Sequence, residues 1–516
     1  MSQLVSEGER PTLPGYPSAD SSPAVPGEKP ELVFGVRDWA AVACASGLAL
    51  WWCAAVDGLM LSSLLVLCGG FALTVAILGF FVCALALRGR GARLTRGSAL
   101  MLAAVVVLAG VPAVTSDTSV RACNALVLAA ACMLEYLLLS GCADDVALRA
   151  SGALSAVGFF LRSQFAHLTH PLRALVRSGR GRASERRAAL LSVIAACAVL
   201  CVVLPLLMRA DAIFGRDLER VFSWMGDDFG TNLVRLARFV LVTLVASSLL
   251  VSLVHGEGAC TSAPSVRVHA ASVAAVLPAL VILDAVYLAF DLIQCGYLFG
   301  GARVSDAVGG YATYARSGFF ELVAVAAINV FVLLVTLQAR RDAPRSRAVD
   351  VAQLALLALT LVMDASAAWR MGLYIHVFGL SELRAFTLLG MVAIAVVVVL
   401  CAVRVLSTRF PLYPVVLGFL LALWCAFALS GVDARVASFD VDGYLSGSIE
   451  TIDVDYLASL SDDALPALER LANEDSSMTA EVSERLRERD VFGDVWSGVR
   501  GRCWATDSLP GLLTGR

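Results

Sequence analysis

The chain has 516 residues, of which 59% are hydrophobic and only 16% are charged, and its formal net charge is −3. A soluble globular protein carries about a quarter charged residues. The composition therefore excludes an ordinary soluble domain and indicates that a lipid bilayer is the main partner of the chain. The small net charge gives no bulk attraction to nucleic acid, so no nucleic-acid partner is expected.

Residues 1–36 are polar and rich in proline, and they contain no apolar signal-peptide core. A segment of this kind buries too little apolar surface to fold by itself. We expect it to be a disordered cytoplasmic tail. The first membrane span then serves as its own uncleaved insertion signal.

Eleven apolar stretches follow, each able to supply the roughly 20 residues that a helix needs to cross a bilayer. Because a helix satisfies its backbone polar groups within one segment, the sequence predicts an all-α fold, a polytopic transmembrane helical bundle of about 11 spans. The expected spans are 39–56, 60–88, 97–115, 119–141, 188–208, 232–255, 269–293, 318–338, 351–370, 384–406 and 411–430.

Arginine supplies almost all of the positive charge, since Lys29 is the only lysine. Cytoplasmic loops carry the excess of basic residues, and three loops are strongly basic, at 88–96, 170–187 and 339–347. All three lie on the cytoplasmic side if the N-terminus is inside, and an odd number of spans then puts the C-terminal tail outside. The Ala-, Val- and Arg-rich composition is typical of GC-rich bacterial genomes. We therefore expect a multi-pass protein of the bacterial cytoplasmic membrane.

The spans and loops divide the chain into five expected regions. They are the disordered tail (1–36), a four-span bundle (37–141), a basic cytoplasmic loop (142–187), a seven-span core (188–430) and a soluble acidic helical tail (431–516). Within the basic loop, residues 150–176 repeat aromatic and leucine residues near helical spacing. This pattern fits either a helix lying in the membrane interface or an ordinary loop helix packed on the bundle.

The acidic tail contains two segments with helical patterns, at 463–474 and 479–490. Asp462 or Asp463 is expected to cap the first of these helices. A protein partner that binds through residues 431–516 is one possible role for the tail.

Ionisable residues inside membrane spans are costly and are therefore candidates for function. Asp284 and Asp291 are seven positions apart and share one helix face. Glu321 begins the eighth expected span, and Asp364 lies six residues before Arg370 in the ninth. A transport or proton-relay role competes with a structural role at each site. Carboxylates can cap helix ends at the headgroups, or pair with an arginine and lock the bundle.

The sequence contains no motif for catalysis, metal binding or cofactor binding. His167 and His170 are three positions apart, but polar loop histidines are far commoner than metal sites. Residues 440–450 resemble a calcium loop, yet Leu445 stands where the loop requires glycine. The phosphate-binding, nucleophile-elbow and zinc-protease patterns are missing. We expect no catalytic residue, no metal site and no cofactor.

Four sequence phrases, in order, are ADAIF (210–214), YLFGG (297–301) with YATYARSGFFEL (311–322), RMGLYIHVFGLSELR (370–384) and DVDYLASLSDDALPAL (453–468). Together they resemble an uncharacterised bacterial membrane family, the domain of unknown function 4173. The family pattern has a second basic residue where this chain has Ser317, and threonine where it has Ser381. The resemblance implies a polytopic membrane protein and supplies no activity or substrate.

In the topology inferred from the basic loops, these phrases lie at the outer ends of the spans, together with most of the charged candidate residues. Arg316 lies within two turns of Glu321 and can pair with it or with a carboxylate of a neighbouring span. We expect an outer functional face over which the tail folds, and the alternative is a structural plug of loops on helix ends. The candidate functional or pairing residues are Asp284, Asp291, Tyr314, Arg316, Glu321, Asp364, Arg370 and Arg384.

Three functions remain open. Many spans and intramembrane carboxylates such as Asp284 and Glu135 favour a small-solute or proton-linked transporter. The separate tail and the missing catalytic motifs favour a scaffold or sensor that presents the tail to a protein partner. A membrane enzyme acting on a lipid-linked substrate comes third, with outer carboxylates such as Asp211 but only a short first outer loop.

Overall fold

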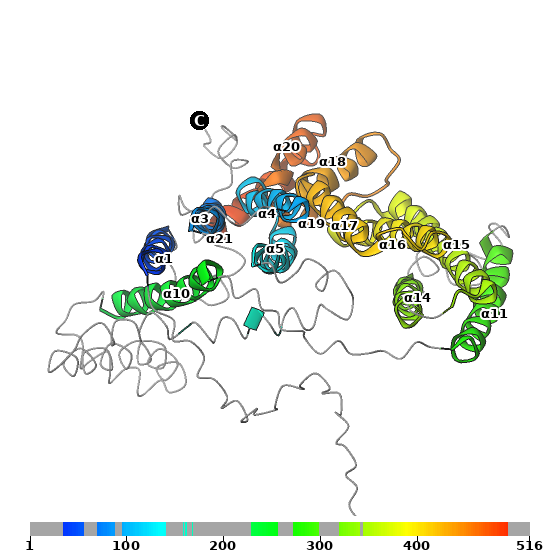
Figure 1. Cartoon of the computed structure of the whole chain (residues 1–516). Helices are drawn as coiled ribbons and strands as arrows, with labels where there is room; N and C mark the ends of the chain where they lie inside the picture. The colour runs from blue at the N-terminus through cyan, green and yellow to red at the C-terminus, as the bar shows by residue number, and fades with distance from the viewer. Residues whose placement is uncertain are drawn as a thin grey trace, which may run out of the picture.

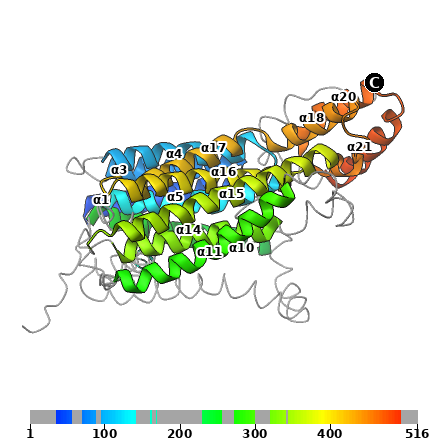
Figure 2. The same ribbon diagram turned by 90° about the vertical axis from the view of Figure 1, so that its right-hand side faces the viewer.

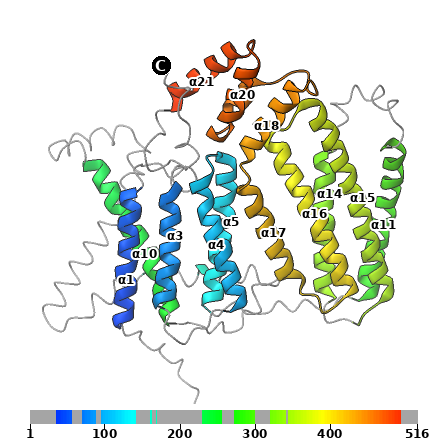
Figure 3. The ribbon, with the colours of Figure 1, turned by 90° about the horizontal axis from the view of Figure 1, so that it is seen from above.

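The computed structural model describes residues 35–55, 70–87, 95–140, 158, 160–161, 168, 229–255, 272–298, 319–340 and 344–493. Over these ranges the chain is helical and contains no β-strand. The long helices lie side by side with roughly parallel axes (Figure 3) and form a curved row when viewed along those axes (Figure 1). The predicted all-α fold is confirmed for this part of the chain.

The long helices of the row are α1 (Val36–Ala55), α3 (Gly70–Leu87), α4 (Arg96–Val114), α5 (Thr118–Leu139), α10 (Phe229–His255), α11 (Val273–Leu298), α14 (Phe319–Ala339), α15 (Arg347–Phe378), α16 (Glu382–Leu406) and α17 (Leu412–Ala428). Within the described ranges, six helices are long and apolar enough to cross a membrane, namely α4, α5, α10, α11, α15 and α16. A seventh results if α17 and the helix after it count as one bent span.

Several predictions concern residues outside the described ranges. These are the tail before Gly35, the span at 188–208, most of the helix expected at 150–176, Tyr314, Arg316 and the chain after Gly493.

The first group of helices is formed by α1, α3, α4, α5 and α10, which pack around one apolar core. Pro112 lies inside α4 and has no N–H to give to the carbonyl of Leu108. The side chain of Asn124 on α5 donates to that carbonyl at 2.9 Å. The fully buried Asn124 also accepts from the indole N–H of Trp424 on α17 at 3.2 Å. One polar joint therefore connects α4, α5 and α17.

The second group is formed by α11, α14, α15 and α16, and α15 contacts the other three. Because α17 contacts both α16 and α4, it connects the two groups. Several arginines near helix ends lie at one end of the bundle, which we call the arginine end; they include Arg96, Arg345, Arg347 and Arg404, whereas Arg121 and Arg384 lie at the other end. Arg345 there donates to the carbonyl of Val405 at 3.1 Å, which joins the beginning of α15 to the end of α16.

The C-terminal tail packs on the opposite end of the bundle, which we call the tail end (Figure 2). The tail consists of α18 (Val432–Leu445), α19 (Val454–Ser459), a 3₁₀ turn (Asp462–Ala464), α20 (Leu465–Glu474) and α21 (Thr479–Gly493). It bends away from α17 by 59° at Gly431, whose φ of +65° favours glycine. Leu457, Leu468 and Leu471 of the tail are fully buried in a cluster that also contains Val111 and Val120 of the bundle.

The two helical segments predicted in the tail are confirmed as α20 and α21. The predicted cap is wrong, because Ala464 occupies the N-cap of α20 and makes no side-chain hydrogen bond there. Asp463 instead accepts from the hydroxyl of Thr115 at 3.0 Å. A contact with the bundle has replaced a local cap.

Candidate functional site

Polar side chains lie along two interfaces of α15, one with α14 and one with α11, and we call them together the polar seam. Its buried members are Asp291, Gln294, Asn329, Gln353, Thr360, Asp364, Ser366 and Arg370, and its half-buried members are Asp284 and Thr336. Gln353 donates to the hydroxyl of Thr336 at 3.0 Å, nearest the arginine end. Asn329 donates to the hydroxyl of Thr360 at 3.1 Å, two turns deeper.

Nearer the tail end, the seam is organised around Gln294 of α11. Its side-chain carbonyl accepts from the hydroxyl of Ser366 at 2.8 Å and from the guanidinium of Arg370 at 3.0 Å. Gln353 and Arg370 are 17 positions apart on α15, which corresponds to roughly 25 Å of helix. The hydrocarbon core of a bilayer is about 30 Å thick. The seam is therefore long enough to cross most of a membrane.

Three carboxylates in the seam have oxygens without a hydrogen-bond partner among the described residues. Both oxygens of Asp291 are buried and unpartnered, and the side chain is only 5% exposed. One oxygen of Asp364 and one of Asp284 are also buried without a partner. Asp291 lies one turn before Gln294, and Asp364 lies one turn beyond Thr360, so each is next to a paired member of the seam.

A second cluster of carboxylates lies at the tail end, where three helices begin. Asp117 is the N-cap of α5, Glu382 is the first residue of α16, and Asp433 is in the first turn of α18. One oxygen from each lies within 4.8 Å of the other two. We call these three residues the carboxylate cluster. It joins the first helix group, the second helix group and the tail.

Hydrogen bonds around the carboxylate cluster fix the tail on the bundle. Asp463 accepts from the backbone N–H of Ser116 at 3.4 Å. The hydroxyl of Tyr456 accepts from the backbone N–H of Glu382 at 2.8 Å. Asp440 of α18 accepts from the backbone N–H of Leu380, between α15 and α16, at 2.6 Å. Tail side chains thus bind the turns of both helix groups.

Electrostatics around Asp117 are dominated by burial. The pKa of Asp117 is raised from 3.8 to about 7, chiefly by burial and also by the negative charges of Asp433 and Glu382, while the N–H groups of Val120 and Ser119 lower it. Burial also raises the pKa of Asp463, which lies close enough to feel the charge of Asp433.

The pKa shift of Asp117 predicts that the fold loses stability as the pH rises. In the unfolded chain Asp117 has its ordinary pKa of 3.8, whereas in the folded chain its pKa is raised to about 7. Folding therefore takes up a proton between these values, and the stability of the fold falls progressively from pH 3.8 to about pH 7. The measurement is the thermal unfolding midpoint of the full chain across this interval, in buffer with a chelator so that no cation competes with protons.

The control for this prediction is Asp117→Asn, whose remaining side-chain oxygen still accepts the two cap hydrogen bonds. The titratable groups that interact with Asp117 are Glu382, Asp433 and Cys123, and Asp463 interacts with Asp433 beside them. The basic residue nearest to Asp117 in the sequence is Arg121. The variant should be more stable at pH 7 and should lose most of the pH dependence. An unchanged profile would contradict the assignment.

The residues proposed from the sequence fall into different environments. Asp284 and Asp291 lie on α11, and Asp364 and Arg370 lie on α15, so all four belong to the polar seam. Glu321 is exposed at the beginning of α14. Arg384 turns away from the seam: it donates to the carbonyls of Phe378 and Gly379, and its guanidinium lies over the ring of Tyr374 at 4.3 Å.

Sequence reasoning missed the carboxylate cluster and, apart from Asn329, the amide and hydroxyl members of the seam. Asp117 follows two hydroxyl residues and precedes Thr118 and Ser119, a pattern that marks a helix N-cap. Ser381, which caps α16 by accepting from the N–H of Arg384, marks another. These local signals locate helix beginnings, but they do not show that three beginnings meet in space.

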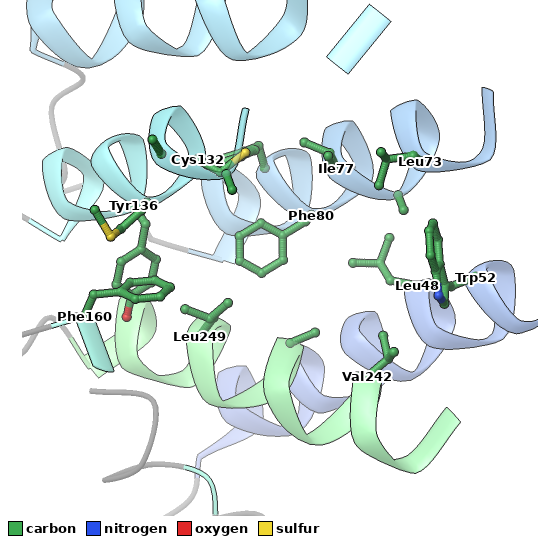
Figure 4. Close-up of a pocket in the computed structure, with 16 residues that line it drawn as sticks. Leu48, Trp52, Leu73, Ile77, Phe80, Cys132, Tyr136, Phe160, Val242 and Leu249 are labelled. Atoms are coloured by element: carbon green, nitrogen blue, oxygen red, sulfur yellow. The ribbon is translucent and has the colours of Figure 1, made fainter. Parts of the chain in front are cut away.

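An apolar cavity of about 620 Å³ lies within the first helix group, between α1, α3, α5 and α10 (Figure 4). Its lining includes Phe80, Phe160 and Leu249. The hydroxyl of Tyr136 at one end donates to Ser252 at 2.8 Å. The lining residues carry no charged group, so this cavity suits a hydrocarbon chain and offers nothing to recognise a polar substrate.

A family model for a domain of unknown function, DUF4153, matches residues 102–471. The chain belongs to the DUF4153 family. The prediction of an uncharacterised family holds, but the number 4173 given by the resemblance was wrong. The DUF4153 match begins within α4 and ends in α20, so it includes the polar seam and the carboxylate cluster. Comparison with curated proteins and with solved structures gives no match.

Proposed function

We propose that this member of the DUF4153 family is a proton-linked membrane transporter that uses the polar seam as its path. Asp291 supports the proposal most directly, because its two oxygens are buried at membrane depth without a hydrogen-bond partner among the described residues. An ionised carboxylate in such a place is costly. A carboxyl that takes up and releases a proton there is the usual element of a proton relay. Gln294, Ser366 and Arg370 supply the neighbouring polar groups.

The proposed topology has about 11 spans, with the arginine end in the cytoplasm and the tail end outside. The helices from α14 to α17 support it, because their ends alternate between the two ends of the bundle. The arginines at the arginine end fit the cytoplasmic preference of basic residues. The expected regions 1–36, 37–141, 142–187, 188–430 and 431–516 complete this proposal, in a bacterial cytoplasmic membrane.

Proton flux into liposomes tests the proposed path. Full-length protein is reconstituted with a trapped pH-sensitive dye, and a potassium gradient with valinomycin drives protons inward. The native protein should acidify the lumen faster than protein-free liposomes. Asp291→Asn and Asp364→Asn should each reduce the rate to that of protein-free liposomes, because an amide does not exchange a proton as a carboxyl does.

Glu135→Gln is the matched control, since it removes a carboxylate at membrane depth outside the seam. Glu135 lies on α5 and accepts from the hydroxyl of Ser98 at 2.7 Å, a bond that glutamine can keep. The control should conduct like the native protein. Native flux equal to that of protein-free liposomes, or flux retained in both seam variants, would refute the proposal.

A scaffold that binds a protein through the tail is the second candidate. The tail projects beyond the helix row (Figure 2) and displays exposed charges, including ion pairs of Arg470 with Asp442 and of Arg485 with Asp455. The same tail is tied to the bundle by its buried cluster, which favours a fixed rather than a free module. Removal of residues 431–516 separates the two functions: a scaffold loses its partner, whereas a transporter keeps its path.

A further inference from the structure

The carboxylate cluster gathers three acidic side chains around one point, and the basic residue nearest to them in sequence is Arg121, which is buried one turn after Asp117. Asp117 is 2% exposed and Asp433 is 3% exposed. Within the described part of the chain, Asp117, Glu382 and Asp433 form no ion pair. Two neighbouring arginines bind elsewhere: Arg384 donates to the carbonyls of Phe378 and Gly379, and Arg435 donates to that of Ser430.

Helix dipoles offset only part of this charge. Each helix N-terminus behaves as roughly +0.5 of an elementary charge. The beginnings of α5, α16 and α18 therefore supply roughly +1.5 against −3 at most, when all three carboxylates are ionised. The charge that remains at the cluster is negative, which favours a bound cation.

Two of the three carboxylates use one oxygen in backbone hydrogen bonds, and each of the three has an oxygen without a hydrogen-bond partner. One oxygen of Asp117 accepts from the N–H groups of Ser119 and Val120, at 2.9 and 3.0 Å. One oxygen of Asp433 accepts from the N–H of Ser461 at 2.9 Å. The second oxygens of Asp117 and Asp433 and one oxygen of Glu382 are buried without a hydrogen-bond partner.

We propose that Asp117, Glu382 and Asp433 bind one divalent cation through their carboxylate oxygens, with Ca²⁺ as the preferred ion. Carboxylate oxygens are hard ligands that suit Ca²⁺ and Mg²⁺. Two oxygens bound to one Ca²⁺ at about 2.3–2.6 Å stand at most about 5 Å apart. The cluster's oxygens lie within 4.8 Å of one another. Small side-chain rotations are enough to bring all three oxygens to one calcium ion.

The bound cation would act as a clamp between three parts of the fold. Asp117 belongs to the first helix group, Glu382 to the second, and Asp433 to the tail. Binding the ion therefore stabilises the docked tail and holds the two groups together at the tail end. This role is independent of the proton path through the polar seam.

Calcium binding to the full-length protein tests the site. The protein is purified in nanodiscs, stripped with a chelator, and titrated with radioactive Ca²⁺ by equilibrium dialysis. One Ca²⁺ should bind per chain, with a dissociation constant of about 0.1–1 mM if the site resembles extracellular calcium modules. Ca²⁺ should also raise the unfolding midpoint and protect the tail from protease, and Mg²⁺ should do so less effectively.

Asp433→Asn should weaken this binding about tenfold or more, and its remaining oxygen still accepts from Ser461. Glu382→Gln provides a second test, because its backbone bond to Tyr456 does not involve the side chain. The control is Asp442→Asn on the same helix, whose carboxylate is 65% exposed and which should bind Ca²⁺ like the native protein. The proposal is overturned if no stoichiometric Ca²⁺ binding occurs, or if both cluster variants bind as tightly as the control.

Discussion

Replacing Leu468 with alanine is expected to detach the tail from the bundle. Leu468 is fully buried in the cluster that joins α18, α19 and α20 to Val111 and Val120 of the bundle. Truncating a buried leucine costs about 2–5 kcal/mol, because apolar contacts are lost and a cavity remains. A loss of 2 kcal/mol raises the open population about 30-fold. Native-state proteolysis of the full chain measures this population as the rate at which the tail is cleaved.

Phe439→Ala is the matched control on the same tail. Phe439 of α18 is 46% exposed, so its truncation should change the stability by less than about 1 kcal/mol. Equal cleavage rates in the two variants would show that the buried cluster does not hold the tail. The native protein, the control and Leu468→Ala should therefore rank in that order of increasing cleavage.

Replacing Gly379 with alanine is expected to cost about 2–6 kcal/mol. Gly379 follows α15 with a φ of +73° and a ψ of −176°, a backbone region that is essentially restricted to glycine and costs other residues about 1–3 kcal/mol. A Cβ there would lie 2.5 Å from the Oδ1 of Asp440. Asp440 must then move and release the N–H of Leu380, which costs about 1–3 kcal/mol. The measurement is the free energy of unfolding in detergent, together with the rate of tail cleavage.

Gly372→Ala is the control for this substitution, since it adds the same methyl group to the same helix. Gly372 lies inside α15, and nothing is within 4 Å of the position of its Cβ. Alanine at that position should be neutral or stabilising by about 0.5–1 kcal/mol. If both glycine variants behave alike, the turn at Gly379 does not position Asp440 as described.

Apolar patterning was sufficient to predict the helices but not their partners. The expected spans at 97–115 and 384–406 agree closely with α4 and α16, because long apolar runs bounded by polar residues mark helix ends directly. The two tail helices were predicted for the same reason. The residues around a helix end determine where the helix begins or stops, so helix ends can be predicted from a short stretch of sequence.

The sites depend on contacts between distant residues, and the sequence does not show these. Asp284 and Asp364 were recognised because a charge inside an apolar run is conspicuous. Gln294, Gln353 and Thr360 were missed, because neutral polar residues are common in spans and only their hydrogen bonds mark them. Asp463 was predicted to cap the helix that follows it. In the structure it instead accepts hydrogen bonds from Thr115 and Ser116, which lie 348 and 347 positions away in the sequence.

The proline in α4 has a consequence for how the helices find their depth in the membrane. Apolar helix faces in lipid slide past one another at little cost, since lipid tails are as apolar as the side chains they replace. The amide of Asn124 has no such freedom, because it meets the carbonyl that Pro112 leaves open and the indole of Trp424 at one alignment only. The carbonyl that Pro112 leaves free in α4 thus fixes the positions of α5 and α17 along the bundle axis. The tail, which follows α17 directly, is set at its height above the bundle by the same joint.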